Sequence, residues 1–445
     1  MRAFSSVGLG IALGCLLLIP GVARSQDTVM VNGQPAVLLS EASYENLMDR
    51  LDTIEASLGE VCDDGWEDIS DEGWSHKVGG GISADCVMYA AQNAGSLAKV
   101  ANAQNYFEYR FLRMSVAGQG YGVYDYKIEF DFEPENDGRE GVVVRNVYFG
   151  IHEVPILGHV RFGNFRAPFG LEWSTAYRYL TFMERSLLGI FPAAWKTGVA
   201  AFNHSADENL TWAFGAFFED IDQVRKERIG DAQGTIALAR ATYTPYYDEP
   251  SEGRYLIHTG IGYQYVDDRD DLATFSVRPE VHESGSWLTT APIAVDQYNV
   301  LGLEGALVWG PLSVQSQYMY VPVSGFDFHG FYVYGSWFLT GENRAYSRTS
   351  GCFTRVKPHT NFWFVRGAGL GCGAVELATR WSHLDLSGTG HADGGVQNDL
   401  TVGLNWHWNP YVRWTFNYIH SWTKYDNGDA TAENDILGIR GQVDF

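Results

Sequence analysis

The chain has 445 residues, and an excess of acidic side chains gives it a formal charge of −23 at pH 7. A surplus of this sign argues against a nucleic acid as partner. Glycine occurs 50 times and aromatic residues make up 14% of the chain, which is typical of proteins with many turns and aromatic girdles.

The first 25 residues have the features of a secretory signal peptide. Arg2 precedes an apolar run over residues 11–19, and the small residues Ala23 and Ser25 stand before a cleavage point at Gln26. The apolar run is too short to span a bilayer. Cys15 lies inside this run rather than after it, which disfavours a lipoprotein.

A short heptad pattern follows the signal. Ser40 can cap a helix over residues 41–58, in which apolar side chains recur at spacings of 3, 4, 3 and 4: Tyr44, Leu47, Leu51, Ile54 and Leu58. A seam of this length is not stable alone. Either it forms a trimeric coiled coil in the periplasm, or it packs on the rest of the chain or frays. Residues 60–74 are acidic and are expected to be a linker, so that residues 26–78 form a periplasmic arm.

From residue 79 to 445 the chain alternates apolar and polar residues, with a period of two. Between residues 125 and 132 the even positions are apolar, whereas the odd positions carry charge: Asp125, Lys127, Glu129 and Asp131. One face suits lipid and the other suits water, and repetition of such strands predicts an all-β, transmembrane, antiparallel β-barrel. A soluble propeller or sandwich is the alternative, but no blade-length repeat is present. A change of phase predicts a β-bulge near residues 111–112.

Seventeen segments qualify as strands. An antiparallel bacterial barrel normally has an even number, so that one is wrong or one is missing, and 16 or 18 strands remain open. The candidates are residues 79–89, 105–117, 122–133, 141–153, 157–165, 196–204, 209–219, 234–244, 254–266, 273–281, 297–308, 312–322, 329–340, 373–385, 398–408, 411–423 and 435–445.

The connection over residues 173–194 is far longer than a hairpin needs. It is too apolar for bulk water and too charged for a dry core, so we expect it to fold into the barrel as a constriction loop. Six charged residues are candidates for the path of an anion: Arg166, Glu172, Arg178, Glu184, Arg185 and Lys196. Four are positive and two negative. The alternative is that Glu184 and Arg185 fix the loop to the wall through ion pairs.

Four stretches carry a family resemblance, in sequence order: residues 163–172 with 179–187, 338–344, 373–382, and 404–410 with 417–420. Together they resemble the phosphate-selective porin O and P family of bacterial outer membranes. The resemblance implies a homotrimer of 16-stranded barrels embedded in outer-membrane lipid, in which arginines along the lumen and lysines at the funnels pass small anions, phosphate in particular. The chain departs from this pattern because it has only seven lysines. A general or sugar-permeable porin is therefore the alternative. The terminal alternation, ending at Phe445, looks like the C-terminal signal for outer-membrane assembly.

Four cysteines remain once the signal is removed. In an oxidising compartment the favoured pairing is Cys352 with Cys372, closing an external loop, and Cys62 with Cys86. No CxxC or spaced histidine pair accompanies them, so that neither a metal nor another cofactor is expected. Motifs of hydrolases and nucleotide-binding enzymes are absent from the sequence, and an outer-membrane barrel enzyme is the alternative of a different class.

Overall fold

The computed structural model describes residues 28–31, 34–37, 73–99, 103–132, 142–219, 233–268, 271–364, 369–388, 394–429 and 431–445. Contacts divide the chain into two units, Met1–Asp68 and Ile69–Phe445. In the first unit the described residues form one hairpin, β1 (Thr28–Val31) with β2 (Gln34–Val37). The predicted signal peptide, the helix over residues 41–58 and Cys62 lie outside the described residues.

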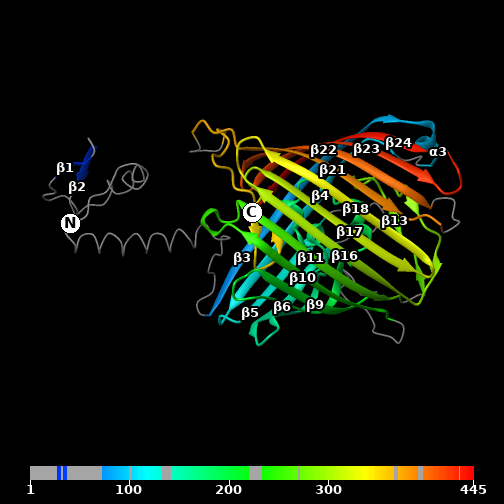
Figure 1. Ribbon diagram of the computed structural model, residues 1–445, viewed down its shortest axis with the longest axis horizontal. Helices are drawn as coiled ribbons and strands as arrows, with labels where there is room; N and C mark the ends of the chain where they lie inside the picture. Colours follow the sequence, from blue (N-terminus) through cyan, green and yellow to red (C-terminus); the bar gives the residue numbers. More distant parts are fainter. Residues whose placement is uncertain are drawn as a thin grey trace. The chain divides into compact units, whose positions relative to one another are not determined.

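The second unit is a closed antiparallel barrel of 16 strands (Figure 1). Each barrel strand pairs with the next barrel strand along the chain, and β24 pairs with β3 to close the barrel. The strands are β3 (Trp74–Gln92), β4 (Tyr106–Gly120), β5 (Tyr124–Asp131), β6 (Val143–Val154), β7 (Gly158–Arg166), β8 (Trp195–His204), β9 (Leu210–Phe218), β10 (Thr235–Tyr247), β11 (Tyr255–Asp267), β16 (Gln297–Trp309), β17 (Leu312–Val323), β18 (Phe326–Phe338), β21 (Ala374–Asp385), β22 (Gly395–Asn409), β23 (Val412–Tyr425) and β24 (Ala432–Asp444).

The alternation of the sequence decides which side of the wall each residue faces. In β21, Glu376 and Arg380 are 3% and 1% exposed, whereas their neighbours Leu377 and Trp381 are 39% and 42% exposed. Charged side chains thus point into the barrel and apolar ones point outward, as a strand between lipid and a polar lumen requires. The predicted bulge is also present: Ser83 pairs with Phe111 and Ala84 with Tyr109, so that Arg110 is the extra residue.

Sixteen of the seventeen predicted strands belong to the barrel, and the one over residues 273–281 is wrong. Its alternation is real, since Ala273, Phe275 and Val277 are all buried. However, these residues form a narrow hairpin in the β11–β16 connection rather than part of the wall. Its paired segments are β12 (Leu272–Ala273) with β15 (Ile293–Ala294), and β13 (Ser276–Val277) with β14 (Leu288–Thr289).

The two ends of the barrel differ in their connections. At one end most turns are short, such as residues 121–123, 155–157 and 310–311. At the other end most are longer, and they include residues 167–194 and 268–296. Because outer-membrane barrels have short periplasmic turns and longer extracellular loops, we assign the short-turn end to the periplasm. Residues 339–373 are the exception, since this long connection leaves from the short-turn end.

In the described part of the chain, helices are short and occur only in the connections between strands. They are α3 (Ala94–Lys99), α4 (Leu171–Ser174), and the 3₁₀ turns η1 (Tyr177–Tyr179), η2 (Leu187–Ile190) and η3 (Glu249–Ser251). Among the described residues no helix is both long and apolar enough to cross a membrane.

Candidate pore constriction and vestibule

The constriction loop, residues 167–194, starts on β7, crosses the lumen and returns to β8. Its apolar residues are buried, with Phe169 and Leu171 at 0% and Phe182 at 1% exposure. Side chains of the opposite wall hold its backbone: Asn405 Nδ2 donates to Thr181 O at 2.7 Å, and Arg413 Nη1 donates to Leu180 O at 2.6 Å. The predicted inward fold of this loop is therefore confirmed.

Near its start, at Gly170, the loop passes very close to β17. The φ of Gly170 is 72°, and a Cβ atom at this position would lie 2.4 Å from Nε2 of Gln317. Gln317 Oε1 accepts a hydrogen bond from the backbone N–H of Glu172 at 2.9 Å. Glycine is required here both by the backbone conformation and by the approach of the wall.

Glu172 fixes the loop to the wall. Its carboxylate accepts hydrogen bonds from the backbone N–H and the hydroxyl of Ser186, and it lies 3.0 Å from Nη1 of Arg380 on β21. Arg380 also pairs with Glu280 of the 268–296 connection. One buried guanidinium thus joins two inward segments to the wall.

Glu184 is paired with two arginines of the wall rather than with its neighbour in sequence. Its carboxylate lies 2.8 Å from Arg110 Nε on β4 and 2.8 Å from Arg440 Nη2 on β24. Burial alone would raise the pKa of Glu184, but Arg110 and Arg440 hold that pKa well below its usual range. Glu184 is therefore ionised and compensated, and it contributes no free negative charge.

Arg185 supports the fold of the loop. Its guanidinium donates to the backbone oxygens of Thr175 and Glu172 at 3.1 and 3.3 Å and lies 4.5 Å from the ring centroid of Trp173. Burial lowers the pKa of Arg185 to about 10, which still leaves it charged at neutral pH. The side chain holds together the turn that it belongs to.

The other three predicted cations lie in different places. Arg166, at the end of β7, donates to the backbone oxygens of Trp173 and Thr175, both at 3.1 Å, and its guanidinium carbon lies 4.6 Å from the centroid of Trp195. Arg178 lies 3.7 Å from Asp444 and is partly exposed. Lys196 lies 3.8 Å from Glu219. The structure therefore does not gather the six predicted residues around one opening.

The 339–373 connection enters the lumen from the short-turn end. Within it, β19 (Tyr346–Ser347) pairs with β20 (Cys352–Phe353), and Phe353 packs in one cluster with Leu171 of the constriction loop. Sequence reasoning did not find this inward segment. It also placed Cys352 and Cys372 in one disulfide, whereas both are free thiols in the structure, Cys352 being buried and Cys372 exposed. Cys86 is free as well.

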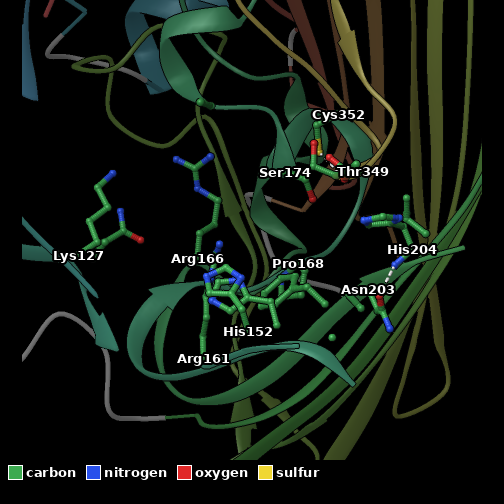
Figure 2. Close-up of a pocket in the computed structure, with 18 of the residues that line it drawn as sticks. Lys127, His152, Arg161, Arg166, Pro168, Ser174, Asn203, His204, Thr349 and Cys352 are labelled. Carbon is green, nitrogen blue, oxygen red and sulfur yellow. Dashed lines mark hydrogen bonds between the residues drawn. The ribbon is translucent and has the colours of Figure 1, made fainter. Parts of the chain in front are cut away.

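A cavity of about 800 Å³ lies between the constriction loop and the short turns (Figure 2). We call it the vestibule. Strands β4 to β10 form its wall. Loop residues such as Pro168, Ser174 and Arg178 border it on one side, and Thr349, Ser350 and Cys352 border it from the 339–373 connection. Six Arg and Lys side chains line it against two carboxylates, a surplus of four positive charges: Arg113, Lys127, Arg161, Arg166, Arg178 and Arg240 against Glu129 and Glu153.

Two of these cations have no carboxylate partner. Arg113 pairs with Asp131, and Arg240 pairs with Glu304. By contrast, Arg161 and Arg166 form no ion pair with any carboxylate that the structure describes, and the Nε atom of each is buried without a hydrogen-bond partner there. Their charge is therefore available to a solute in the vestibule.

Four vestibule cations, all on strands, were not among the predicted site residues: Arg113, Lys127, Arg161 and Arg240. The signal was present for Lys127, which belongs to the charged face of residues 125–131. Arg113, Arg161 and Arg240 are likewise lumen-facing positions of alternating strands. Alternation identifies the lumen face, but it does not show which lumen residues share one cavity.

A closed barrel with apolar side chains outside, charged side chains inside and a lumen narrowed by inward loops is an outer-membrane channel. The chain belongs to the family described as phosphate-selective porin O and P, whose model matches residues 77–445. It is a porin of the bacterial outer membrane, and because members of this family are channels, the alternative of a barrel enzyme is set aside.

Comparison with known proteins finds distant relatives. The chain is 24% identical to Porin O of Pseudomonas aeruginosa over 419 residues, which cover 84% of this chain and 90% of that protein. It is 29% identical to an uncharacterized protein of Caulobacter vibrioides over 285 residues, 59% of this chain and 54% of the other.

Among solved structures, the outer-membrane channel DcaP of Acinetobacter baumannii matches with a TM-score of 0.50 at 11% identity, over 84% of this chain and 99% of that one. OprB of Pseudomonas putida matches with a TM-score of 0.50 at 9% identity, over 84% and 95% of the two chains. At these identities the likeness concerns the fold alone.

Proposed function

We propose that this porin passes small anions by passive diffusion, with phosphate as the first candidate. The observation that supports the proposal is the positive surplus of the vestibule, above all the two guanidinium groups of Arg161 and Arg166 that have no carboxylate partner. A solute that enters the vestibule meets these charges at short range.

The net charge of −23 does not contradict an anion path. Exposed charges are screened within about 8–10 Å at physiological salt, whereas charges on the wall of a narrow, weakly screened passage act directly on the passing ion. The acidic residues of the constriction loop, Glu172 and Glu184, are both paired with buried wall arginines. The sign of the local charge therefore decides the preference.

Phosphate is favoured over other anions by the kind of cation present. A guanidinium offers a planar pair of donors that matches two phosphate oxygens, whereas an ammonium acts as a point charge. The vestibule has five arginines and one lysine, so that most of its cations can bind phosphate through two donors at once. A general or sugar-permeable porin is the alternative, supported by aromatic residues that line the same cavity, such as Tyr124, Tyr177 and Phe202.

The test is a measurement of reversal potential in a planar bilayer under a KCl gradient, followed by addition of inorganic phosphate. We expect the reversal potential to have the sign of an anion-selective channel, and phosphate to block the chloride current. A channel that prefers cations contradicts the proposal. If the channel prefers anions but is not blocked by phosphate, the proposal of an anion path stands and that of phosphate as the solute is wrong.

Arg161 offers the sharpest variants, because its guanidinium contacts rings rather than the loop backbone: it lies 4.8 Å from the centroid of Tyr148 and 4.7 Å from that of Phe202. Arg161→Gln should lower the anion preference. Arg161→Lys should keep the preference for chloride over potassium but weaken the block by phosphate. The positive charge remains, whereas the paired N–H donors of the guanidinium are lost. Lys424→Gln, which removes an exposed charge outside the vestibule, is the control and should change neither.

We further propose the organisation that the sequence predicts for the rest of the chain: a signal peptide over residues 1–25, a periplasmic arm over 26–78 and a membrane domain over 79–445. The proposal also includes a homotrimer, in which the heptad of residues 41–58 adds a three-stranded seam. A periplasmic arm is consistent with the barrel, whose first strand begins at Trp74 on the short-turn end.

A further inference from the structure

Three neighbouring strands bring two imidazoles and a carboxylate together on the vestibule wall. His152 and His159 lie on β6 and β7, on either side of the short turn over residues 155–157, and Asp125 lies on β5. Asp125 stands opposite Gly150, and the backbone N–H of His152 donates to Val123 O at 2.7 Å, which fixes the register of β5 and β6 here. His152 and His159 both line the vestibule, and Figure 2 shows His152 there.

Both imidazoles approach the same oxygen of Asp125. Nε2 of His159 lies 2.8 Å, and Nε2 of His152 lies 3.2 Å, from the same atom, Oδ1 of Asp125. The two imidazole rings stack with their centroids 3.8 Å apart. His159 forms a hydrogen bond with the carboxylate, but Nε2 of His152 is buried and has no hydrogen-bond partner among the residues that the structure describes. The group therefore holds a ring nitrogen that the protein itself does not satisfy.

The position between these side chains is occupied by glycine. A Cβ atom on Gly150 would lie 2.0 Å from Oδ1 of Asp125 and 2.3 Å from Nε2 of His159. Any larger residue at position 150 would displace both groups from their present contact. The absence of a side chain at residue 150 is what allows the carboxylate and the imidazole to meet.

We propose that Asp125, His152 and His159 bind a divalent transition-metal ion, with Zn²⁺ as the reference ion. Imidazole nitrogens and a carboxylate oxygen are ligands that Zn²⁺ takes at about 2.0–2.2 Å, and a site with three protein ligands leaves a fourth position for water or a solute. Both imidazoles line the vestibule. Ca²⁺ and Mg²⁺ are disfavoured because they require oxygen ligands.

Two other groups of similar composition are weaker candidates. In the group of His329, His383 and Asp385, the two rings are 6.1 Å apart and Nδ1 of His383 is engaged by Asn398 at 2.8 Å. In the group of Glu108, His282 and Glu283, one imidazole already lies between two carboxylates, at 2.7 and 3.2 Å. Neither brings two ring nitrogens within 3.2 Å of one carboxylate oxygen, as the group of Asp125 does.

The experiment is a calorimetric titration of the purified, folded porin in detergent with Zn²⁺ alone, after treatment with a chelator. The variants are His159→Gln, which removes a ligand, and Gly150→Ala, which fills the space between ligands. The control is His204→Gln, because His204 lines the same vestibule but lies outside the proposed ligand group, with its Nδ1 2.9 Å from Ser205 O. We expect the first two variants to lose one equivalent of Zn²⁺ or to bind it at least about tenfold more weakly, and the control to match the wild type.

Absence of Zn²⁺ binding by the wild type overturns the proposal. So does binding of the same stoichiometry and affinity in His159→Gln, because the ion is then held elsewhere, for instance at the group of His329 or that of His282. Should His159→Gln fail the heat-modifiability test of a folded barrel, His152→Gln takes its place, since the His152 side chain is 36% exposed. The readout is binding in detergent, so that it is independent of whether the pore selects anions.

Discussion

At the scale of single residues, the inward loops are held by buried arginines of the wall. Arg380 is 1% exposed and pairs with Glu172 of the constriction loop and Glu280 of the 268–296 connection. Arg440 pairs with Asp85 on β3 and with Glu184. Such pairs need not stabilise the protein more than apolar residues would, but removing one partner leaves a buried, uncompensated charge.

Replacement of Arg380 tests this role. Arg380→Gln leaves Glu172 and Glu280 without their guanidinium, at a cost of about 3–5 kcal/mol, which we expect to appear as release of the two loops. Single-channel recordings should show a larger and noisier conductance than that of the wild type. Lys424→Gln, at an exposed position, serves as the control and should behave as the wild type does. An unchanged conductance in Arg380→Gln would show that the loops are held by their apolar contacts alone.

The partners of the predicted site residues could not be read from the sequence. Arg110, Arg380 and Arg440 lie 74, 208 and 256 residues from the loop carboxylates that they contact. The sequence shows charged residues in an apolar loop, and this pattern indicates a lumen. It does not show which wall positions face the loop, because that depends on strand register around a closed barrel. The sequence offered ion pairs between loop and wall only as an alternative, and the wall arginines that form them emerged only from the structure.

At the scale of elements, alternation predicts a strand wherever one face is buried and the other is exposed. It identified every strand of the barrel because each lies between lipid and lumen. It failed over residues 273–281, where the same pattern belongs to a hairpin whose buried face packs on apolar side chains inside the barrel. It gave no warning of the 339–373 connection, which packs by Tyr346 and Phe353 without a regular period.

Removal of the β19–β20 hairpin should widen the vestibule. A variant that lacks residues 345–354 loses the packing of Tyr346 and Phe353 against Leu171, so that we expect a larger single-channel conductance. The sign of the reversal potential should persist, because Arg161 and Arg166 belong to β7. Trp363→Ser alters an exposed residue of the same connection and should leave conductance unchanged. A conductance equal to that of the wild type would show that the hairpin does not narrow the path.

At the scale of the whole molecule, the proposed trimer can be tested apart from the barrel. Cross-linking of the detergent-solubilised protein, with native gels, should show three chains. Deletion of residues 41–58 should weaken the trimer if the heptad contributes a seam, and heat-modifiability will show whether the barrel itself is intact. A monomeric wild type would contradict the trimer. If the deletion variant forms a trimer as stable as that of the wild type, the barrel alone is responsible for assembly.

The position of the vestibule has one more consequence. It lies only on the short-turn side of the constriction loop, so that the unpaired charges of Arg161 and Arg166 are distributed unevenly along the path. In a passage with fixed charge near one mouth, mobile counter-ions accumulate under one polarity and are depleted under the other. We therefore expect the pore to rectify: currents at equal and opposite voltages should be unequal, and this inequality should report the orientation of the channel in a bilayer.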